Sequence, residues 1–177
     1  MMPTVGVTGP APVLACVLDT NIVLDVWVFD DLEARPLRLS LGLPDVVGQA
    51  GGNGALSRSG EGEQGRRIRW LATPEMRAEL ARVLTYPHLV RRQPLASERA
   101  ERVLSAYDAA VTWCDPAPRA RFVCTDGDDQ KFIDLAVAHH AILVSKDKAV
   151  LRLKKRLATL GVHVMRTWSA ETASPGA

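Results

Sequence analysis

Apolar residues along the chain follow two patterns, short runs and stripes at helical spacing. Runs rich in apolar residues at 13–18, 68–73, 141–145 and 162–168 predict strands. The first run, VLACVL, has no polar position, as expected of a strand that is buried on both faces. The stretches between the runs predict helices, which are expected from about Asn21, over 31–41, from Pro74 to Pro87, and over 96–112, 129–140 and 148–160.

The alternation of strands with helices predicts an α/β fold with a mostly parallel central sheet and helices on both of its faces. A single domain over 12–168 is expected, because 177 residues can bury one substantial core. The stretch 42–65 holds 8 of the 13 glycines and shows no apolar period, which predicts a flexible insertion in this domain. The termini, 1–11 and 169–177, are small, polar or bear Pro and Gly, and are predicted to be loose.

The composition is that of an ordinary soluble globular protein, with 47% hydrophobic and 24% charged residues. No apolar run approaches the ~20 residues that a membrane-spanning helix needs, and no secretory signal is recognisable at the start. We therefore expect a cytoplasmic protein without membrane contact. The three cysteines form no CxxC pair, which argues against a zinc site and a disulfide framework.

Charge is segregated along the chain, although the net charge is only +2. Acidic residues exceed basic ones over 1–65 and 103–145, whereas basic residues dominate 66–102 and 146–177. This alternation suits an anionic polymer that is held by basic surfaces around an acidic, cation-binding pocket. Solvated helix faces would also produce it, so the pattern alone does not decide.

Two aspartates directly follow predicted strands. Asp19 follows the first strand, and Asp147 follows the strand at 141–145, where the hydroxyl of Ser145 could support it. Because the carboxyl ends of parallel strands share one edge of a sheet, we expect both aspartates at the edge where α/β proteins bind ligands. Each aspartate could equally cap the helix that follows it, so neither alone distinguishes a cap from a metal ligand.

Glu79 borders the buried face of the helix that begins at Pro74. In helical projection it lies beside the apolar stripe, whereas Glu75 lies further toward solvent. A carboxylate in that position is partly desolvated and needs a cation or a hydrogen-bond donor. Arg82, one turn further on, could satisfy it, so a structural ion pair is the alternative to metal ligation.

The sequence DGDDQKFID places four aspartates within nine residues. Asp129 shares the buried side of its helix with Phe132, at the first turn, and Asp126 and Asp128 lie in the preceding turn. Aspartates in a first turn favour capping and the helix dipole, so metal ligation is again one of two interpretations.

Taken together, the four candidate carboxylates converge on one edge of the predicted sheet. Carboxylates so close to one another repel unless a cation neutralises them. Ligation by oxygen atoms alone selects hard ions such as Mg²⁺ or Mn²⁺. Such ions activate water for attack on a phosphodiester, which predicts a hydrolase of nucleic acid.

These motifs resemble those of PIN domains, a family of small metal-dependent nucleases. The resemblance rests on VLDTNIVLD near the start, ATPEMRAELARVL in the middle, and CTDGDDQKFIDLAV and ILVSKDKAVL toward the end. It spans nearly the whole chain outside 42–65 and implies a three-layer α/β/α fold with an acidic pocket. Within the family, the motifs are similar to those of bacterial proteins described as toxins of toxin–antitoxin systems.

The resemblance implies which residues form the catalytic, metal-binding group, namely Asp19, Glu79, Asp129 and Asp147. Three further residues are expected to support these ligands, namely Asn21, Asp126 and Ser145. The chain departs from the family pattern at Gly127, where relatives often have Pro, and at Gln130, where they often have Asp or Asn. The long glycine-rich insertion is also unusual, but no departure removes an expected ligand.

The expected partners follow from the same resemblance. RNA is the expected substrate, with Arg152, Lys154 and Lys155 as candidate contacts to its phosphates, although a solvated helix face would give the same residues. A cognate antitoxin is a candidate protein partner. Many such domains also dimerise, so a homodimer is a further candidate.

Two other functions are compatible with the sequence. A phosphatase could use Asp19 as a covalent nucleophile, but such enzymes carry a second aspartate two residues later, where this chain has Asn21. A PIN-like module could instead bind RNA or protein without cleaving anything. The favoured prediction is a ribonuclease dependent on Mg²⁺ or Mn²⁺.

Overall fold

The structure, a computed structural model, describes residues 13–44, 68–87, 89 and 97–169. The predicted insertion at 42–65 lies outside the described residues from 45 onward. The predicted loose terminus 1–11 also lies outside them, as does the terminus at 169–177 except for its first residue.

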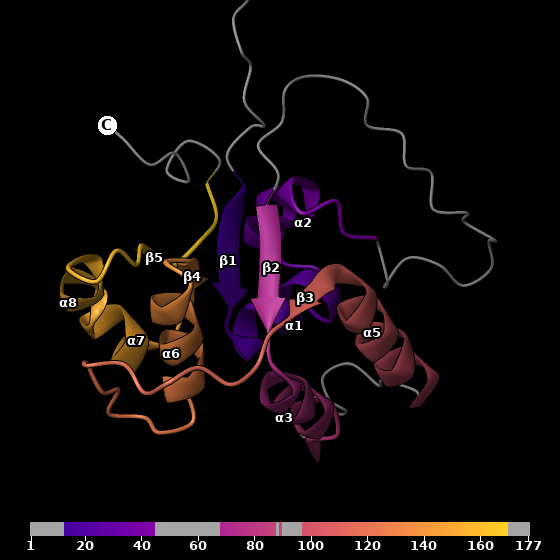
Figure 1. The fold of residues 1–177 in the computed structure, drawn as a ribbon. Coiled ribbons are helices and arrows are strands. Elements are labelled where there is room, and N and C mark those ends of the chain that lie inside the picture. The colour runs from indigo at the N-terminus through magenta and orange to yellow at the C-terminus, as the bar shows by residue number, and fades with distance from the viewer. Residues whose placement is uncertain (1–12, 45–67, 88, 90–96, 170–177) are drawn as a thin grey trace, which may run out of the picture.

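The centre of the molecule is a five-stranded parallel sheet with the order β3-β2-β1-β4-β5 (Figure 1). The strands are β1 (Leu14–Leu18), β2 (Ile68–Ala72), β3 (Val111–Trp113), β4 (Ile142–Val144) and β5 (Val164–Met165). Helices flank this sheet, so the fold is the three-layer α/β/α arrangement that the sequence predicts. From β1 the chain adds β2 and β3 on one side of the sheet, and it then adds β4 and β5 on the other side. The switch point, at which parallel sheets bind ligands, therefore lies between β1 and β4.

The helices fall into two groups along the chain. The first comprises α1 (Thr20–Trp27), the 3₁₀ turn η1 (Leu32–Ala34), α2 (Arg35–Ser40), α3 (Pro74–Leu84) and α5 (Ser97–Ala110). The second comprises α6 (Gln130–Ala138), α7 (Lys148–Arg152) and α8 (Lys154–Ala158). In Figure 1, α6, α7 and α8 gather beside β4 and β5, whereas α3 and α5 lie on the side of β2 and β3.

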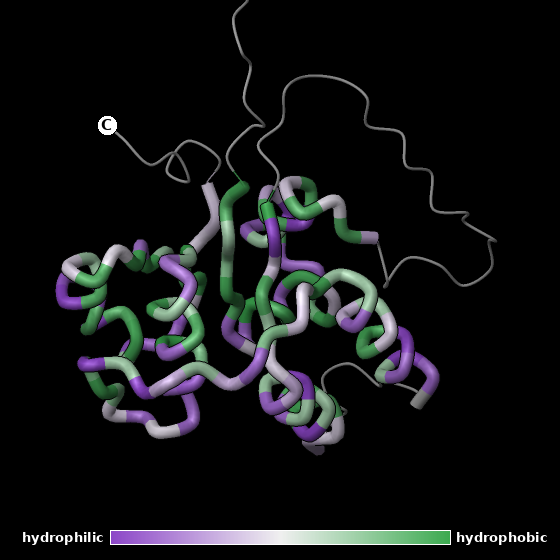
Figure 2. Tube along the Cα trace, viewed as in Figure 1, coloured by the Kyte–Doolittle hydropathy of each residue, from purple (hydrophilic) through white to green (hydrophobic). Residues whose placement is uncertain are grey.

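The core forms around β1, which is hydrophobic along its whole length in Figure 2. Cys16, Val17 and Leu18 are buried there between the two helix layers. An aromatic group extends the core towards the β3 edge, because the rings of Trp27 and Trp70 lie 5.6 Å apart and those of Trp70 and Tyr107 5.0 Å apart.

Strand β3 corrects a prediction. The sequence predicts a helix over 96–112, but α5 ends at Ala110 and Val111–Trp113 pairs in parallel with β2. No Gly or Pro separates the helix from the strand, so the boundary carries no breaker signal. The β-branched and aromatic residues of VTW favour a strand, and pairing with β2 decides in its favour.

The basic helix predicted over 148–160 is likewise divided into α7 and α8. The backbone N–H of Leu153 donates to the carbonyl of Val150, three residues back, so the helix tightens and turns at this residue. The helix predicted over 31–41 is similarly the turn η1 followed by α2. None of the described helices is long and apolar enough to cross a membrane.

Candidate active site at the carboxyl edge of the sheet

Asp19 is fixed at the carboxyl end of β1 by both its backbone and its side chain. Its N–H donates to the carbonyl of Val144 at 3.0 Å, which continues the pairing of β1 with β4. Its carboxylate accepts from the Asn21 N–H at 3.3 Å and from the Ser145 hydroxyl at 2.7 Å. The side chain therefore caps α1, as one interpretation of the sequence has it, and is only 2% exposed.

Asp147 occupies the matching position after β4. One carboxylate oxygen accepts from the N–H of Ala149 at 2.6 Å and caps α7. The N–H of Asp147 donates to the hydroxyl oxygen of Ser145 at 3.1 Å. Ser145, which is fully buried, thus connects Asp19 and Asp147 across the edge of the sheet.

Glu79 reaches the same edge from α3. The helix begins at Pro74, is capped by Thr73, and buries Met76 and Leu80, so Glu79 lies beside its buried face as predicted. One Glu79 oxygen accepts from the Thr20 hydroxyl at 2.7 Å, and the other forms an ion pair with the ammonium of Lys131. The sequence indicated Arg82 as the balancing cation, but the ammonium that contacts Glu79 comes from α6.

Asp129 immediately precedes α6 and makes no capping hydrogen bond with its side chain. Its Oδ2 is buried and has no hydrogen-bond partner. Burial is the largest cause of a rise in the pKa of Asp129 to about 7, and the negative charges of Asp19, Asp147, Asp126 and Glu79 contribute the rest of this rise. A cap is therefore not the reason for an aspartate at this position.

The same electrostatic coupling appears at Asp19. Burial raises its pKa, the hydrogen bonds from Ser145 and Asn21 oppose that rise, and the charges of Glu79 and Asp147 add to it. The structure thus brings together the four carboxylates that the sequence singles out, from β1, α3, the start of α6 and the start of α7. Such a group is costly to keep ionised without a cation.

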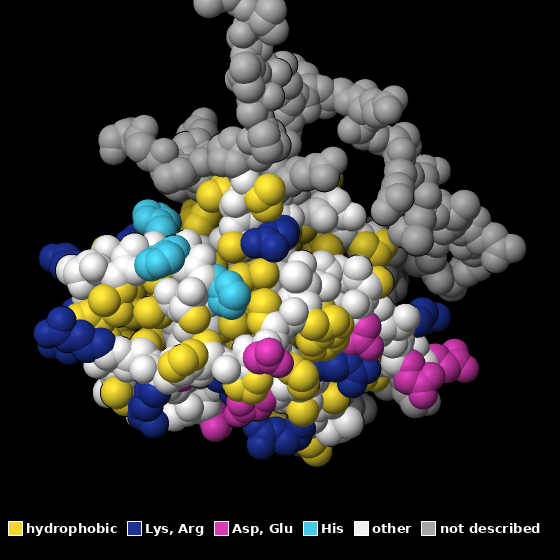
Figure 3. Space-filling model, in the orientation of Figure 1, with side chains coloured by type: hydrophobic (Ala, Val, Ile, Leu, Met, Phe, Trp, Pro, Cys, Tyr) yellow, Lys and Arg dark blue, Asp and Glu magenta, His cyan; other side chains and the backbone are white. Residues whose placement is uncertain are grey.

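An open hollow adjoins Glu79. It has a volume of about 330 Å³ and is lined by Glu75, Ala78, Glu79, Arg82, Asp128 and Lys131. In Figure 3, acidic and basic side chains lie next to one another along the lower edge of the molecule, where β1 and β2 end in Figure 1. A bound polymer could approach Glu79 through this hollow.

Comparison with protein families matches residues 15–149 to the model of the PIN domain, which covers about three quarters of the chain. The chain belongs to the PIN-domain family. PIN domains are generally nucleases that use divalent metal ions, so this PIN domain falls among hydrolases of nucleic acid. Comparison with curated protein sequences gave no match.

The donor chemistry of the pocket fits a hard divalent cation, since it consists of carboxylates with one buried oxygen left unpaired. Among the described residues, however, no three His, Cys, Asp or Glu side chains are arranged to hold an ion as they stand. The hydrogen bonds explain this, because Thr20 and Lys131 hold Glu79 while Ser145 holds Asp19. Some of these contacts would have to open for a metal ion.

The expected supporting residues differ in what they contact. The Ser145 hydroxyl donates to the Asp19 carboxylate and accepts from the backbone N–H of Asp147, whereas Asn21 contributes its backbone N–H. Asp126 is exposed and accepts from the N–H of Asp128 at 3.0 Å, which shapes the turn before α6. Its charge also contributes to the raised pKa of Asp129, although burial is the main cause of that rise.

Gln130 supports the site in a way that the sequence did not reveal. Its amide oxygen accepts from the N–H of Cys124 at 2.6 Å, and its amide nitrogen donates to Asp134 at 2.7 Å and to the carbonyl of Phe122 at 3.3 Å. It therefore holds the loop that leads to Asp129. The sequence carries no signal for this role, because Gln130 differs from a surface glutamine only in being buried, with 6% of the residue exposed.

The candidate RNA contacts lie on the short basic helices. Arg152 ends α7, and Lys154 and Lys155 begin α8, all three being exposed. Beside them, the guanidinium of Arg156 lies 5.9 Å from the ring centroid of Phe122. The basic helices therefore contact the loop that enters the acidic pocket.

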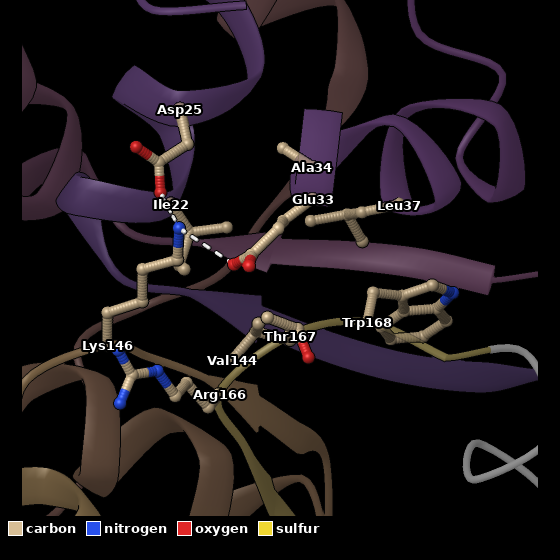
Figure 4. A pocket seen from close by; sticks show the side chains of 10 residues that line it. All are labelled: Ile22, Asp25, Glu33, Ala34, Leu37, Val144, Lys146, Arg166, Thr167 and Trp168. Atoms are coloured by element: carbon tan, nitrogen blue, oxygen red, sulfur yellow. Dashed lines mark ion pairs between the residues drawn. The ribbon is translucent and has the colours of Figure 1, made fainter. Parts of the chain in front are cut away.

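Lys146, which lies between Ser145 and Asp147 in the sequence, is the centre of a second charged cluster. Its ammonium lies 2.8 Å from Asp25 and 3.7 Å from Glu33 (Figure 4). It also lies 2.9 Å from Asp31. The small cavity beside it measures about 10 Å³, too small for a substrate. Asp25 thus pairs with a lysine of the loop between β4 and α7.

Proposed function

We propose that this PIN domain is a ribonuclease dependent on Mg²⁺ or Mn²⁺, and that Asp19, Glu79, Asp129 and Asp147 hold the metal. When bound, the metal would supply charge neutralisation and an activated water for hydrolysis of the phosphodiester bond. Water is then the nucleophile, and no covalent intermediate on the protein is required.

The observation that carries this proposal is Asp129, which has a buried oxygen without a donor and feels the charges of four other carboxylates. A structural role would provide a donor for that oxygen, as Ser145 does for Asp19. An unsatisfied buried carboxylate with a perturbed pKa marks a site for a cation or for proton transfer. Family membership and the adjoining hollow support the same conclusion.

The geometry also argues against a phosphatase with Asp19 as nucleophile. Asp19 is 2% exposed, and both of its oxygens already accept hydrogen bonds. A covalent nucleophile needs an accessible lone pair in line with the substrate. As a metal-holding residue, Asp19 has the orientation that these hydrogen bonds give it.

RNA as the substrate, and a cognate antitoxin as the partner, extend the proposal. They are supported by the motif resemblance to bacterial toxins, by the exposed cations of α7 and α8, and by the alternating charge. Such a toxin would act in the cytoplasm, where its RNA targets are. Co-purification with the product of the adjacent gene would test the antitoxin, and light scattering of the purified chain would test a homodimer.

The decisive experiment measures cleavage of a labelled single-stranded RNA by the full chain with Mn²⁺, with Mg²⁺ and with EDTA. We expect cleavage that requires the metal and falls by at least about 100-fold in Asp19→Asn, with the circular dichroism spectrum unchanged. Asp115→Asn, at an exposed residue, makes the same chemical change outside the pocket and should cleave normally. Equal cleavage by wild type and Asp19→Asn would refute the proposed site, and RNA binding without cleavage would favour a binding module.

A further inference from the structure

Lys131 is a cation built into the acidic pocket. It lies in the first turn of α6, and its side chain is only 14% exposed. Its ammonium pairs with Glu79, donates to the carbonyl of Asp128, and lies 4.9 Å from the ring centroid of Phe132. A lysine usually keeps its ammonium in water, so this placement requires compensation from the groups around it.

Glu79 is the group that compensates it. The Glu79 side chain is 16% exposed, and its charge acts on both Asp19 and Asp129. Within the part of the chain that the structure describes, no other Lys or Arg forms an ion pair with any of the four carboxylates. Lys131 therefore supplies the positive charge that the pocket has in the absence of a metal ion.

We propose that Lys131 acts as a tethered counter-ion, which occupies the cation position at Glu79 in the metal-free protein and yields it when a divalent ion binds. This inference rests on the proposed function, since it requires metal at the four carboxylates. A divalent ion on the Glu79 carboxylate would place two positive charges beside the ammonium, and their repulsion would weaken the ion pair. The ion pair then competes with the metal and lowers its affinity, while it stabilises the empty pocket.

The contacts of Glu79 fit this competition. One of its oxygens accepts from Thr20 and the other is paired with Lys131, so both already have a partner in the metal-free protein. Asp129 keeps an unpaired oxygen in the same pocket. Of the two interactions at Glu79, the one with Lys131 is ionic, and a second cation would weaken it directly.

Isothermal titration calorimetry of the full chain with Mn²⁺, after removal of metal by EDTA, tests the proposal without relying on activity. Lys131→Met should lower the Kd for Mn²⁺ by roughly three- to tenfold, whereas Lys131→Arg, which keeps the charge, should stay closer to wild type. Arg102→Met removes one positive charge from the exposed surface of α5 and should leave the Kd unchanged. In a Glu79→Gln background, Lys131→Met should give no further gain, because the lysine acts through Glu79.

The possible results separate this proposal from the proposed function. If the wild type binds Mn²⁺ but Lys131→Met leaves the Kd unchanged or raises it, the competition alone is overturned. An equal gain from Arg102→Met overturns it too, because the effect would then be one of net charge. Failure of every variant to bind Mn²⁺ overturns both proposals.

A crystal structure of the wild-type chain with Mn²⁺ provides a test that does not depend on the folding of a variant. The Lys131 ammonium should lie away from Glu79, with the Glu79 carboxylate on the ion. An ion bound to Asp19, Asp129 and Asp147 with the Lys131–Glu79 pair intact would overturn the proposal.

Discussion

At the scale of single residues, the pocket concentrates its electrostatic cost on Asp129. Asp19 and Asp147 belong to the same group of carboxylates, but each accepts at least one hydrogen bond from the protein. Asp129 has a buried oxygen without a donor, so burial and repulsion act on it with little opposition. A residue of this kind reduces the stability of the metal-free protein when it is ionised.

Asp129 should therefore make the stability of the metal-free chain depend on pH. Because the pKa rises from 3.8 to about 7 on folding, the folded state holds the proton more tightly. Its contribution to stability is full below pH 3.8 and is lost as the pH rises through about 7. Asp129→Asn, which stays neutral, should be equal to wild type near pH 4 and more stable at pH 8, by the order of 1 kcal/mol after allowance for solvent screening.

Urea denaturation in EDTA across this pH range measures the difference between the two proteins. Asp115→Asn, at an exposed position, serves as the control and should follow wild type at every pH. If Asp129→Asn were no more stable than wild type at pH 8, the ionised carboxylate would not be strained in the folded protein. Added Mn²⁺ should reverse the order, because only wild type gains the full set of ligands.

The sequence could locate Asp19, Asp147 and Glu79 because each lies at a position with local meaning. Two follow apolar strands, and the third lies beside an apolar stripe. Lys131 and Gln130 could not be found in this way, since their partners are brought to them by other elements. Helical spacing also suggested an ion pair between Arg82 and Glu79, but the ion pair of Glu79 is with Lys131 of α6.

At the scale of secondary-structure elements, strand β3 could not be predicted from the pattern of apolar residues alone. The helix before it and the strand itself share residue types without a break, and pairing with β2 set the boundary. The parallel direction of the strands, by contrast, followed from the alternation of strands and helices, and it put Asp19 and Asp147 at one edge of the sheet. The order of strands and helices therefore predicts the place of the site better than the spacing of residues within one helix does.

The loop between β4 and α7 is the element on which Ser145 and Asp147 depend, and Lys146 anchors it. Its ammonium connects this loop to α1 through Asp25 (Figure 4). It also connects the loop to the turn before η1 through Asp31. Burial alone would lower the pKa of Lys146, but its bonds to these two carboxylates raise it above 10.5. The stabilisation is thus fully present below pH 10.5 and is lost only as the pH rises through the higher folded-state pKa.

Lys146→Met should lower the free energy of unfolding by roughly 1–2 kcal/mol at neutral pH, because it leaves Asp25, whose side chain is 15% exposed, without this ion-pair partner. Urea denaturation measures this loss, which should shrink in Asp25→Asn because that variant has already lost the pair. Lys155→Met, an exposed lysine on α8, is the matched control and should change stability by less than about 0.5 kcal/mol. Equal stability of the two lysine variants would mean that the cluster does not anchor the loop.

At the scale of the whole molecule, the alternating charge of the sequence becomes a spatial arrangement. The acidic pocket lies at the carboxyl edge of the sheet, and the short basic helices α7 and α8 follow directly from its last carboxylate, Asp147. In Figure 1 these helices lie on the side of β4 and β5, away from α5. A nucleic acid that reaches the pocket could therefore contact basic helices on that side.

If α7 and α8 hold the RNA backbone, removal of their exposed cations should weaken binding and reduce its dependence on salt. The variant changes Arg152, Lys154 and Lys155 to Gln in an Asp19→Asn background, which prevents cleavage during the measurement. Because each phosphate contact contributes about 0.7 to the slope of log K against log salt on a single strand, three lost contacts should reduce it by about 2. Fluorescence anisotropy of a labelled RNA over a salt series measures the slope. The control removes the same charge from exposed residues elsewhere, namely Arg69, Arg102 and Arg119. Equal reductions in the two triple variants would indicate that net charge, rather than a surface on α7 and α8, attracts the RNA.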